Sequence, residues 1–429
     1  MLTIPSENGE ETGYGGFGMK VPASLSQAFD EKFERLLAEV AASEGLLPAV
    51  EEIRARRFLS RSVAPHVERL TELFNRLEAE KQDAGLDKYW KKGSNPENLR
   101  LAYFLSFMPG NLYRMASVWC ELSRLGFRWP TTGEGSAFRA VEFGAGPATG
   151  SAGILAGEAH APVGLPADGN FALIEQDRST LRLGERFFEA WASHLGLPPY
   201  TTRPFHRKLE LRQGWLPSSA PSFHLWLMSF VLNEFHESPE ALASSLLKSW
   251  DRHLEPEGLA ILVEPALRLQ SRRILELRRA ILEQDRSGEF QVLLPCLGHQ
   301  ACGALADPED WCHEEVAWWR PPYLRLLDEL TGLDRKSLPF SYLVVIRSRR
   351  PRTEILPALA RADRTHRLVS PAFKVGSDWE FYTCGTEDGK RRSRLKQAQG
   401  ELARGSILVN AAIRGDVQAS RIERFDELL

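Results

Sequence analysis

Three cysteines and two histidines lie close together in the segment LLPCLGHQACGALADPEDWCHEE, residues 293–315. The whole chain of 429 residues contains only five cysteines. Cys296, Cys302 and Cys312 are spaced C-x5-C-x9-C, and 71 residues separate Cys312 from Cys384. Such thiols could form a disulfide, a zinc site or an iron-sulfur site. Zinc ribbons usually pair cysteines two to four residues apart, whereas a 4Fe-4S cluster tolerates varied spacing.

Spacing alone leaves the nature of this site open. His299 and His313 could complete a zinc site with three cysteines, or single cysteines could be small buried apolar residues. Cys120, in the helical segment SVWCELSRL, is interpreted in this last way.

A second chemical motif is the glycine-rich segment VEFGAGPATG, which contains Gly144, Gly146 and Gly150. It follows a predicted strand and opens a predicted helix, where glycine permits a sharp turn and the helix N-terminus offers unpaired N–H groups. The same arrangement binds a dinucleotide or S-adenosylmethionine. Because the chain shows no catalytic His, Lys or Tyr set of a nicotinamide enzyme, S-adenosylmethionine is the predicted ligand.

Acidic residues stand at the ends of the strands beside this loop. Glu142 precedes Gly144 by two residues and could hold an amino group of the ligand. Glu175 ends FALIE and could accept hydrogen bonds from ribose hydroxyls, with Asp177 as the alternative. The competing interpretation of each is a solvated acid at a strand end.

The segment SFVLNEF, residues 229–235, ends a further predicted strand, where a methyltransferase presents groups to the methyl acceptor. Asn233, Glu234 and His236 are the candidates for this rim. There is no NPPY or DPPY motif and no cysteine nucleophile here, so methyl transfer stays an open question.

Positive charge gathers towards the C-terminus although the whole chain has a net charge of -3. Residues 347–404 contain 14 Lys and Arg against 7 Asp and Glu, including KRRSRLK at 390–396. Such a run is either a solvated loop or a contact for nucleic acid phosphates.

These residues must be positioned by two kinds of element. Apolar residues at three- and four-residue spacing predict helices from about residue 24 to 125. Strands and helices then alternate, which predicts a doubly wound parallel α/β sheet, followed by a small β-rich tail. We divide the chain into a helical region (1–135), an α/β core (136–287), a cysteine-rich insertion with the last core strand (288–350) and a basic β-rich tail (351–429).

The composition, 43% hydrophobic and 26% charged, is that of a globular protein with sizeable cores. No stretch approaches the roughly 18 apolar residues of a membrane-spanning helix. The first residues resemble neither a secretory signal nor a transit peptide, so a cytoplasmic location is expected. In that reducing compartment a structural disulfide is not expected.

The chain resembles the methyltransferase-like assembly factors of the small ribosomal subunit, which occur in mitochondria and bacteria. The resemblance covers about residues 100–400 and rests on VEFGAGPATGS, ALIEQD, VLNE, LVEPA, PCLGHQAC, DWCH, PFSYLVV and YTCGTEDG. The order PC…C…DWCH…FSYLV is its specific part.

This resemblance implies a class I S-adenosylmethionine-dependent methyltransferase fold and a 4Fe-4S cluster on Cys296, Cys302, Cys312 and Cys384. It assigns no role to His299. It implies small-subunit ribosomal RNA or a pre-ribosomal particle as the partner, and we expect a protein that is monomeric when free. The predicted phosphate contacts are Arg391, Arg392, Arg394 and Lys396. The alternatives are a non-catalytic RNA-binding factor with the same fold, and a small-molecule methyltransferase with a zinc site.

Overall fold

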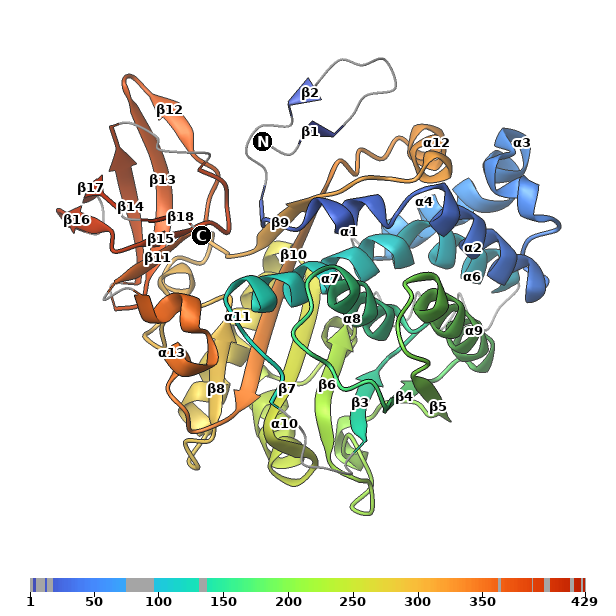
Figure 1. The fold of residues 1–429 in the computed structure, drawn as a ribbon, viewed down its shortest axis with the longest axis horizontal. Coiled ribbons are helices and arrows are strands. Elements are labelled where there is room, and N and C mark those ends of the chain that lie inside the picture. Colours follow the sequence, from blue (N-terminus) through green and yellow to red (C-terminus); the bar gives the residue numbers. More distant parts are fainter. Residues whose placement is uncertain are drawn as a thin grey trace.

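The computed structural model describes residues 3–4, 12–13, 18–74, 96–130, 137–361, 364–387, 389–396, 402–416, 420–425 and 427–428. Its centre is a mixed sheet flanked by helices, with helical N-terminal elements at one end of the molecule and a β-rich C-terminal part at the other (Figure 1). The core strands are β3 (Phe138–Phe143), β4 (Gly169–Glu175), β5 (Thr201–His206), β6 (Phe223–Ser229), β7 (Leu254–Pro265), β8 (Phe290–Leu294), β9 (Glu314–Ala317) and β10 (Ser337–Arg347).

The strand order in this sheet is β5-β4-β3-β6-β7-β10-β8, and β9 pairs with the first half of β10. Neighbours from β5 to β7 are parallel, whereas β10 runs antiparallel to both β7 and β8. The predicted parallel sheet is therefore confirmed except for β10. After β8 the chain forms β9, which pairs with the first residues of β10. β10 therefore starts beside the C-terminal end of β7 and runs back along it in the opposite direction.

Helices cover both faces of the sheet. Alternate residues of each buried strand therefore pack into two different hydrophobic cores, one on each face. In β6, Leu225 and Leu227 pack with the helices of one face, and Trp226 and Met228 with those of the other. The first face carries α8 (Thr149–His160) and α9 (Arg178–His194), and the second carries α10 (Pro239–His253) and α11 (Arg268–Gln284). This is the predicted doubly wound arrangement.

The N-terminal region is helical, as predicted, and packs on α8 and α9. Asp30 is the N-cap of the helix Glu31–Ser43, since its side chain accepts hydrogen bonds from the backbone N–H groups of Lys32 and Phe33, at 2.8 and 3.2 Å. The helices are α1 (Ala23–Gln27), α2 (Glu31–Ser43), α3 (Arg56–Phe58), α4 (Ala64–Phe74), α6 (Pro96–Ala102) and α7 (Met108–Arg124), with α12 (Pro322–Thr331) added from later in the chain. A short hairpin of β1 (Thr3–Ile4) and β2 (Thr12–Gly13) precedes them.

The C-terminal part follows α13 (Arg352–Ile355) and forms a second sheet in the order β16-β17-β14-β13-β11-β15-β18. It has its own small core, which includes Leu368, Phe381, Leu408 and Ile422. The strands are β11 (Thr365–Leu368), β12 (Phe373–Val375), β13 (Asp378–Gly385), β14 (Gly389–Leu395), β15 (Ile407–Val409), β16 (Ala412–Arg414), β17 (Ser420–Arg424) and β18 (Glu427–Leu428). The predicted β-rich tail is thus present, whereas the exact domain limits stay a prediction.

Candidate functional site: a glycine-loop cavity and a cysteine segment

A cavity of about 1140 Å³, here called the glycine-loop cavity, lies at the carboxyl ends of β3, β4, β6 and β7. Ligands of open α/β sheets bind at this edge, where the strand order reverses between β3 and β6. The volume lies slightly above the range of ordinary small-molecule sites, about 300–1,000 Å³. The cavity can therefore hold one ligand of moderate size and part of a second.

The predicted glycine turn lies on the wall of this cavity. Gly144 and Gly146 have φ angles of 61° and 52°, in the left-handed region that favours glycine. A Cβ atom on Gly144 would come within 2.6 Å of Val231 Cγ2, whereas one on Gly146 would meet no atom within 4 Å. Gly146 therefore presents bare backbone to the cavity. Gly150 lies deeper, and a Cβ atom there would be 2.7 Å from Glu142 Oε1.

Glu175 and Asp177 both line the cavity at the end of β4. The backbone N–H of Gly146 donates to Glu175 Oε2 at 3.0 Å, and the N–H groups of Gln176 and Asp177 donate to Oε1 at 2.8 and 2.9 Å. Burial raises the pKa of Glu175. Asp177 caps α9 through Thr180 N at 2.7 Å and pairs with Arg100 at 3.0 Å. Glu175 is therefore held in place by the loop, and Asp177 already has two structural contacts.

Glu142 has a different position from the one expected of a ligand contact. Its side chain is buried and lies behind the glycine turn, outside the cavity wall. The N–H groups of Gly150 and Ser151 donate to its two oxygens at 2.7 and 2.8 Å, and Ser151 Oγ donates at 2.5 Å. Burial raises its pKa to about 7. The geometry makes Glu142 an anchor for the N-terminus of α8.

Of the three predicted rim residues, Asn233 and Glu234 line the cavity, and His236 lies beyond its wall on the exposed surface. Asn233 Oδ1 is buried and has no hydrogen-bond partner in the described part of the chain, and the same is true of Ser229 Oγ. Buried polar atoms normally have partners. These two atoms therefore mark a place where a ligand could supply a hydrogen bond.

Glu264, at the end of β7, is a site residue that the sequence analysis missed. Its Oε1 accepts hydrogen bonds from the N–H groups of Val231 and Leu232, at 3.0 and 2.8 Å. Burial raises its pKa to about 7. It fixes the segment that carries Asn233. The rule used for Glu142 and Glu175, an acid at a strand end, would have found it in LVEPA.

A further part of the cavity wall comes from the N-terminal helices and was also missed. A single π-helical turn, Tyr103–Phe107, joins α6 to α7, and both of its end residues line the cavity. Arg114 donates to Asn111 Oδ1 at 2.8 Å and to the Pro339 carbonyl at 3.2 Å. Its guanidinium lies 5.5 Å from the Phe230 ring centroid, and burial lowers its pKa to about 9. Arg114 has no ion pair with any described residue. The sequence carries no clear signal for Arg114, because α7 also contains Glu121 and Arg124.

The C-terminal sheet is called the barrel here, because β15, which pairs with β11, is followed after two residues by β16, which pairs with β17. The four predicted cysteine ligands lie in one region, with Cys384 in barrel strand β13. Burial, followed by the charges of Cys296, Glu314, Cys302 and Cys384, raises the pKa of Cys312 well above its ordinary value. Burial, followed by the charges of Cys296 and Cys302, also raises the pKa of Cys384, to about 12. Within the described residues, however, no group of three or more His, Cys, Asp or Glu side chains is close enough to hold a metal ion. The four thiols are therefore near one another, but no three of the described side chains converge on one metal position.

Hydrogen bonds fasten the cysteine segment to the rest of the protein. Arg278 donates to the carbonyls of Gly298 and Gln300 at 2.7 and 3.2 Å. Gln300 Nε2 donates to the Gly385 carbonyl at 2.6 Å, next to Cys384 in β13. The loop between Cys296 and Cys302 is therefore held against α11 on one side and β13 on the other.

The two histidines of this segment have different surroundings. His299 Nε2 lies 3.1 Å from the Val292 carbonyl and is also in contact with Arg352. His313 lines the glycine-loop cavity together with Trp311, and their rings are 6.2 Å apart at 20°. The cavity thus reaches the residues on both sides of Cys312.

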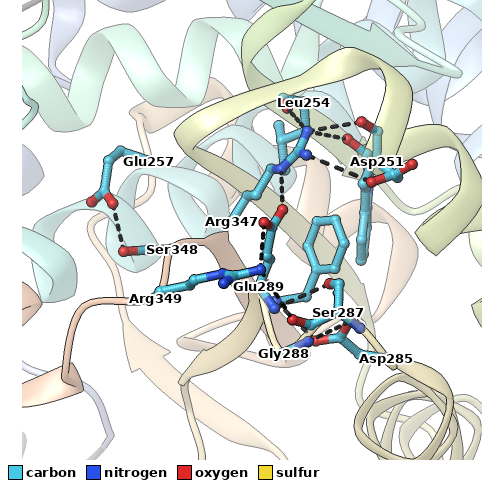
Figure 2. A network of polar contacts seen from close by, with 12 residues as sticks. Asp251, Leu254, Glu257, Asp285, Ser287, Gly288, Glu289, Arg347, Ser348 and Arg349 are labelled. Atoms are coloured by element: carbon cyan, nitrogen blue, oxygen red, sulfur yellow. Dashed lines mark hydrogen bonds and ion pairs between the residues drawn. The ribbon is translucent and has the colours of Figure 1, made fainter.

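Much of the positive charge after residue 347 is used inside the fold. Figure 2 shows Arg347 and Arg349 sharing Glu289, at 3.0 and 3.1 Å, at the end of β10 that lies away from the cavity. Arg347 also donates to the Asp251 carbonyl at 2.8 Å. Arg367 is buried between Glu121 and Glu314. Residues 347–404 have seven more basic than acidic side chains. Fewer than seven positive charges are therefore free to contact a partner.

The predicted RNA contacts lie on β14 and just after it, but they do not share one face. Side chains alternate along a strand, so Arg392 and Arg394 point away from the barrel interior and Arg391 points to the other side. Arg392 and Arg394 both contact the buried carboxylate of Glu380, Arg394 at 2.8 Å, yet remain 44% and 50% exposed. Lys396 is exposed.

The strand order with its single antiparallel strand β10, together with the glycine turn after β3, defines a class I S-adenosylmethionine-dependent methyltransferase fold. The predicted fold class is confirmed. Solved structures similar to this chain include the O-methyltransferase TomG from Streptomyces achromogenes in complex with S-adenosylmethionine, at 11% identity over 56% of this chain and 79% of that chain, with a TM-score of 0.28. An O-methyltransferase from Bacillus cereus is 9% identical over 61% and 96%, with a TM-score of 0.31. A precorrin-6y C5,15-methyltransferase from Geobacter metallireducens is 14% identical over 60% and 93%, with a TM-score of 0.27.

Residues 205–406 match the family described as mitochondrial small ribosomal subunit Rsm22. The matched range includes the rim segment, the three cysteines of residues 293–315, Cys384 and β14, but not the glycine turn. The chain has no match among curated proteins. Among the described residues, no helix is long and apolar enough to cross a membrane. Because the matching family is described as mitochondrial, the cytoplasmic location stays a prediction.

Proposed function

We propose that this chain is an S-adenosylmethionine-binding, iron-sulfur-containing factor of the Rsm22 type that acts on or binds small-subunit ribosomal RNA. The observation that carries the proposal is the glycine-loop cavity, with Glu175 fixed by the glycine turn, in a chain whose residues 205–406 match that family.

The cavity suits S-adenosylmethionine. Gly146 offers bare backbone, and Glu175 offers carboxylate oxygens to a ribose at the end of the second parallel strand. Arg114 is a half-buried cation on the cavity wall without an acidic partner among the described residues, which suits an anionic group of the ligand. The bound cofactor would supply an electrophilic methyl group on a sulfonium sulfur.

The cysteine segment suits a 4Fe-4S cluster on Cys296, Cys302, Cys312 and Cys384. Four thiolates are the usual donors of such a cluster. The four thiols are near enough to one another to contribute to the raised pKa values of Cys312 and Cys384. Since Cys384 belongs to β13 and the other three precede β10, the cluster would tie the barrel to the core.

Methyl transfer is supported by the rim of the cavity. The unpartnered Oδ1 of Asn233 could accept a hydrogen bond from an amine of a nucleobase, and Glu234 offers a carboxylate that could take up its proton. The second candidate is a non-catalytic factor that keeps the fold as a scaffold. It is favoured by the absence of an NPPY-type motif at the rim. A small-molecule methyltransferase with a zinc site is the third.

Calorimetric titration of S-adenosylmethionine into anaerobically purified protein tests the first part. Gly146→Leu should abolish binding, because the side chain would enter the cavity. Gly196→Leu is the matched control, since Gly196 has a similar φ of 68° and open surroundings outside the cavity. No binding by wild-type protein at millimolar ligand would refute the cofactor proposal. Transfer of labelled methyl groups to small-subunit ribosomal RNA, lost in Asn233→Ala, would separate the enzyme from the scaffold.

Filter binding to small-subunit ribosomal RNA over several salt concentrations tests the second part. Replacing Arg391, Arg392, Arg394 and Lys396 with Gln should weaken binding and flatten its salt dependence. A control with the same change in charge replaces four exposed arginines of the N-terminal helices, Arg35, Arg57, Arg61 and Arg69. Superimposable curves for wild type and the fourfold β14 variant would contradict an RNA-binding role for this segment.

A further inference from the structure

The C-terminal sheet closes into a barrel with the strand arrangement of an OB-fold. β11, β13 and β14 form an antiparallel meander, and β17 lies parallel to β14. β15 and β16 are separated by two residues only, so they act as one bent strand that pairs with β11 at one end and with β17 at the other. A five-stranded Greek-key barrel of this kind binds oligonucleotides or oligosaccharides on the face of its second and third strands.

In this protein those two strands are β13 and β14, and their register defines the outward residues. Directly paired residues share a face. One row across four strands is Phe373, Glu380, Arg394 and Arg421. The next row pairs Tyr382 with Arg392, and a third pairs Cys384 with Lys390. The intervening residues Phe381 and Ser393 are fully buried in the barrel. We call Phe373, Tyr382, Lys390, Arg392, Arg394 and Arg421 the barrel face.

Exposed apolar side chains gather on this part of the molecule. Six large hydrophobic side chains are exposed among the described residues, and three of them, Phe373, Val375 and Tyr382, lie on β12 and β13. Their exposed fractions are 47%, 42% and 38%. Isolated exposed apolar residues need no explanation, but a group on one short hairpin indicates a contact surface.

The same surface presents cations around the aromatic rings. Lys390 lies 5.0 Å from the Tyr382 ring centroid and pairs with Asp310. Arg392 and Arg394 lie over the buried Glu380, which orients their guanidinium groups while leaving them half exposed. Arg421 pairs with Asp378 at 2.8 Å and is 51% exposed. The solvent therefore meets guanidinium groups and rings, and the acid that orients two of them is hidden below.

We propose that the barrel face binds single-stranded RNA, with Tyr382 as a stacking platform for one base and Arg392 and Arg394 as phosphate contacts. An aromatic ring can stack only on a base that is free of a duplex, and basic grooves with aromatic platforms are the common device of single-strand binding. The inference rests on the proposed association with ribosomal RNA and names the form of RNA recognised.

The test is fluorescence anisotropy of the full-length, cluster-loaded protein with a labelled single-stranded RNA of mixed sequence and with the same RNA as a duplex. Wild type should bind the single strand more tightly than the duplex. Tyr382→Ala should weaken single-strand binding roughly tenfold or more, and Tyr382→Phe should restore it, because stacking requires only the ring. Phe205→Ala is the control, since Phe205 is 50% exposed on the edge strand β5 of the core sheet.

Equal binding by wild type and Tyr382→Ala would overturn this inference, and so would equal affinity for strand and duplex. Both outcomes would leave the proposed association with ribosomal RNA intact. If wild type bound neither the oligonucleotides nor small-subunit ribosomal RNA, the proposed function itself would fall, and this inference with it.

Discussion

The glycine-loop cavity and the cysteine segment differ in how far the chain alone completes them. Glu175 at the cavity wall, and Glu142 and Glu264 behind it, accept backbone hydrogen bonds that hold the surrounding loops. At the predicted cysteine site, Cys312 of the cysteine segment and Cys384 of β13 have raised pKa values because they are buried beside other thiols. The first site is formed before any ligand binds, whereas the second would become a set of thiolates only on binding the proposed cluster. Removing the ligand should therefore affect the two regions very differently.

The largest expected effect is the loss of the proposed cluster. Cys312→Ser should remove iron, sulfide and the brown chromophore, and should loosen the barrel, because a structural metal site contributes on the order of 10 kcal/mol. Hydrogen exchange should show β13 and β14 losing protection while β3 and β6 keep theirs. Cys120→Ala is the control, since Cys120 is buried in α7. Stoichiometric zinc without iron or sulfide after anaerobic preparation would contradict the cluster.

The second prediction sharpens the other side of the comparison, the carboxylate behind the glycine turn. Burial raises the folded-state pKa of Glu142 to about 7 from an ordinary value of 4.5. A carboxyl with a raised pKa favours the folded state at low pH, and this contribution is lost as pH rises from about 4.5 to about 7. At about 1.4 kcal/mol per pH unit, the loss over this interval is about 3.5 kcal/mol.

Denaturant unfolding of wild type and Glu142→Gln at pH 5 and pH 8 measures this loss. Wild type should lose stability relative to the variant as pH rises. Glu264 and Glu314, whose pKa values burial also raises to about 7, are present in both proteins and cancel. A stability difference between the two proteins that does not change with pH would contradict the prediction.

The third prediction concerns ligand binding in the preformed cavity. Glu175→Ala should weaken S-adenosylmethionine binding by roughly tenfold to a hundredfold, because hydrogen bonds to a charged group contribute about 1.5–3 kcal/mol. The cluster content should not change, since Glu175 lies at the end of β4, outside the cysteine segment. Calorimetry measures the affinity, and Glu189→Ala, an exposed acid on α9, is the control. If both variants bound like wild type, the assignment of Glu175 to the ribose would be wrong.

The sequence predicted the parts of the molecule that depend on local pattern. β6 and β7 are continuous apolar runs buried on both faces, and both were found. β5, TTRPFH, was missed because it is an exposed edge strand with a proline and no apolar run. β8 was missed because its five residues lead directly into the cysteine segment.

The candidate site divides in the same way. Glu175 could be predicted because its position follows from the end of one strand. Arg114 could not, since α7 is buried on nearly all sides and its sequence does not tell which side meets the cavity. The contact of Arg392 and Arg394 with Glu380 depends on the pairing of β13 with β14, which composition does not reveal. Of the four predicted RNA contacts, Arg392 and Arg394 therefore point outward, Arg391 points to the other side of β14, and Lys396 follows the strand.

The smallest expected effect tests whether those two outward arginines contact phosphate. Glu380 is hidden beneath Arg392 and Arg394 and offsets part of their charge. Replacing it with Gln keeps the shape of the side chain and adds one net positive charge to the barrel face, so the affinity for single-stranded RNA should rise a few-fold. The salt dependence of binding should become steeper, because phosphate neutralisation sets that slope.

If instead the ion pairs serve only the fold, Glu380→Gln should leave RNA affinity unchanged or lower it together with the thermal stability of the barrel. Anisotropy at several salt concentrations, beside a melting curve of each protein, distinguishes the two; Glu423→Gln, an acid paired with Arg414 at 3.2 Å on β17 next to the barrel face, is the control for a change of charge alone.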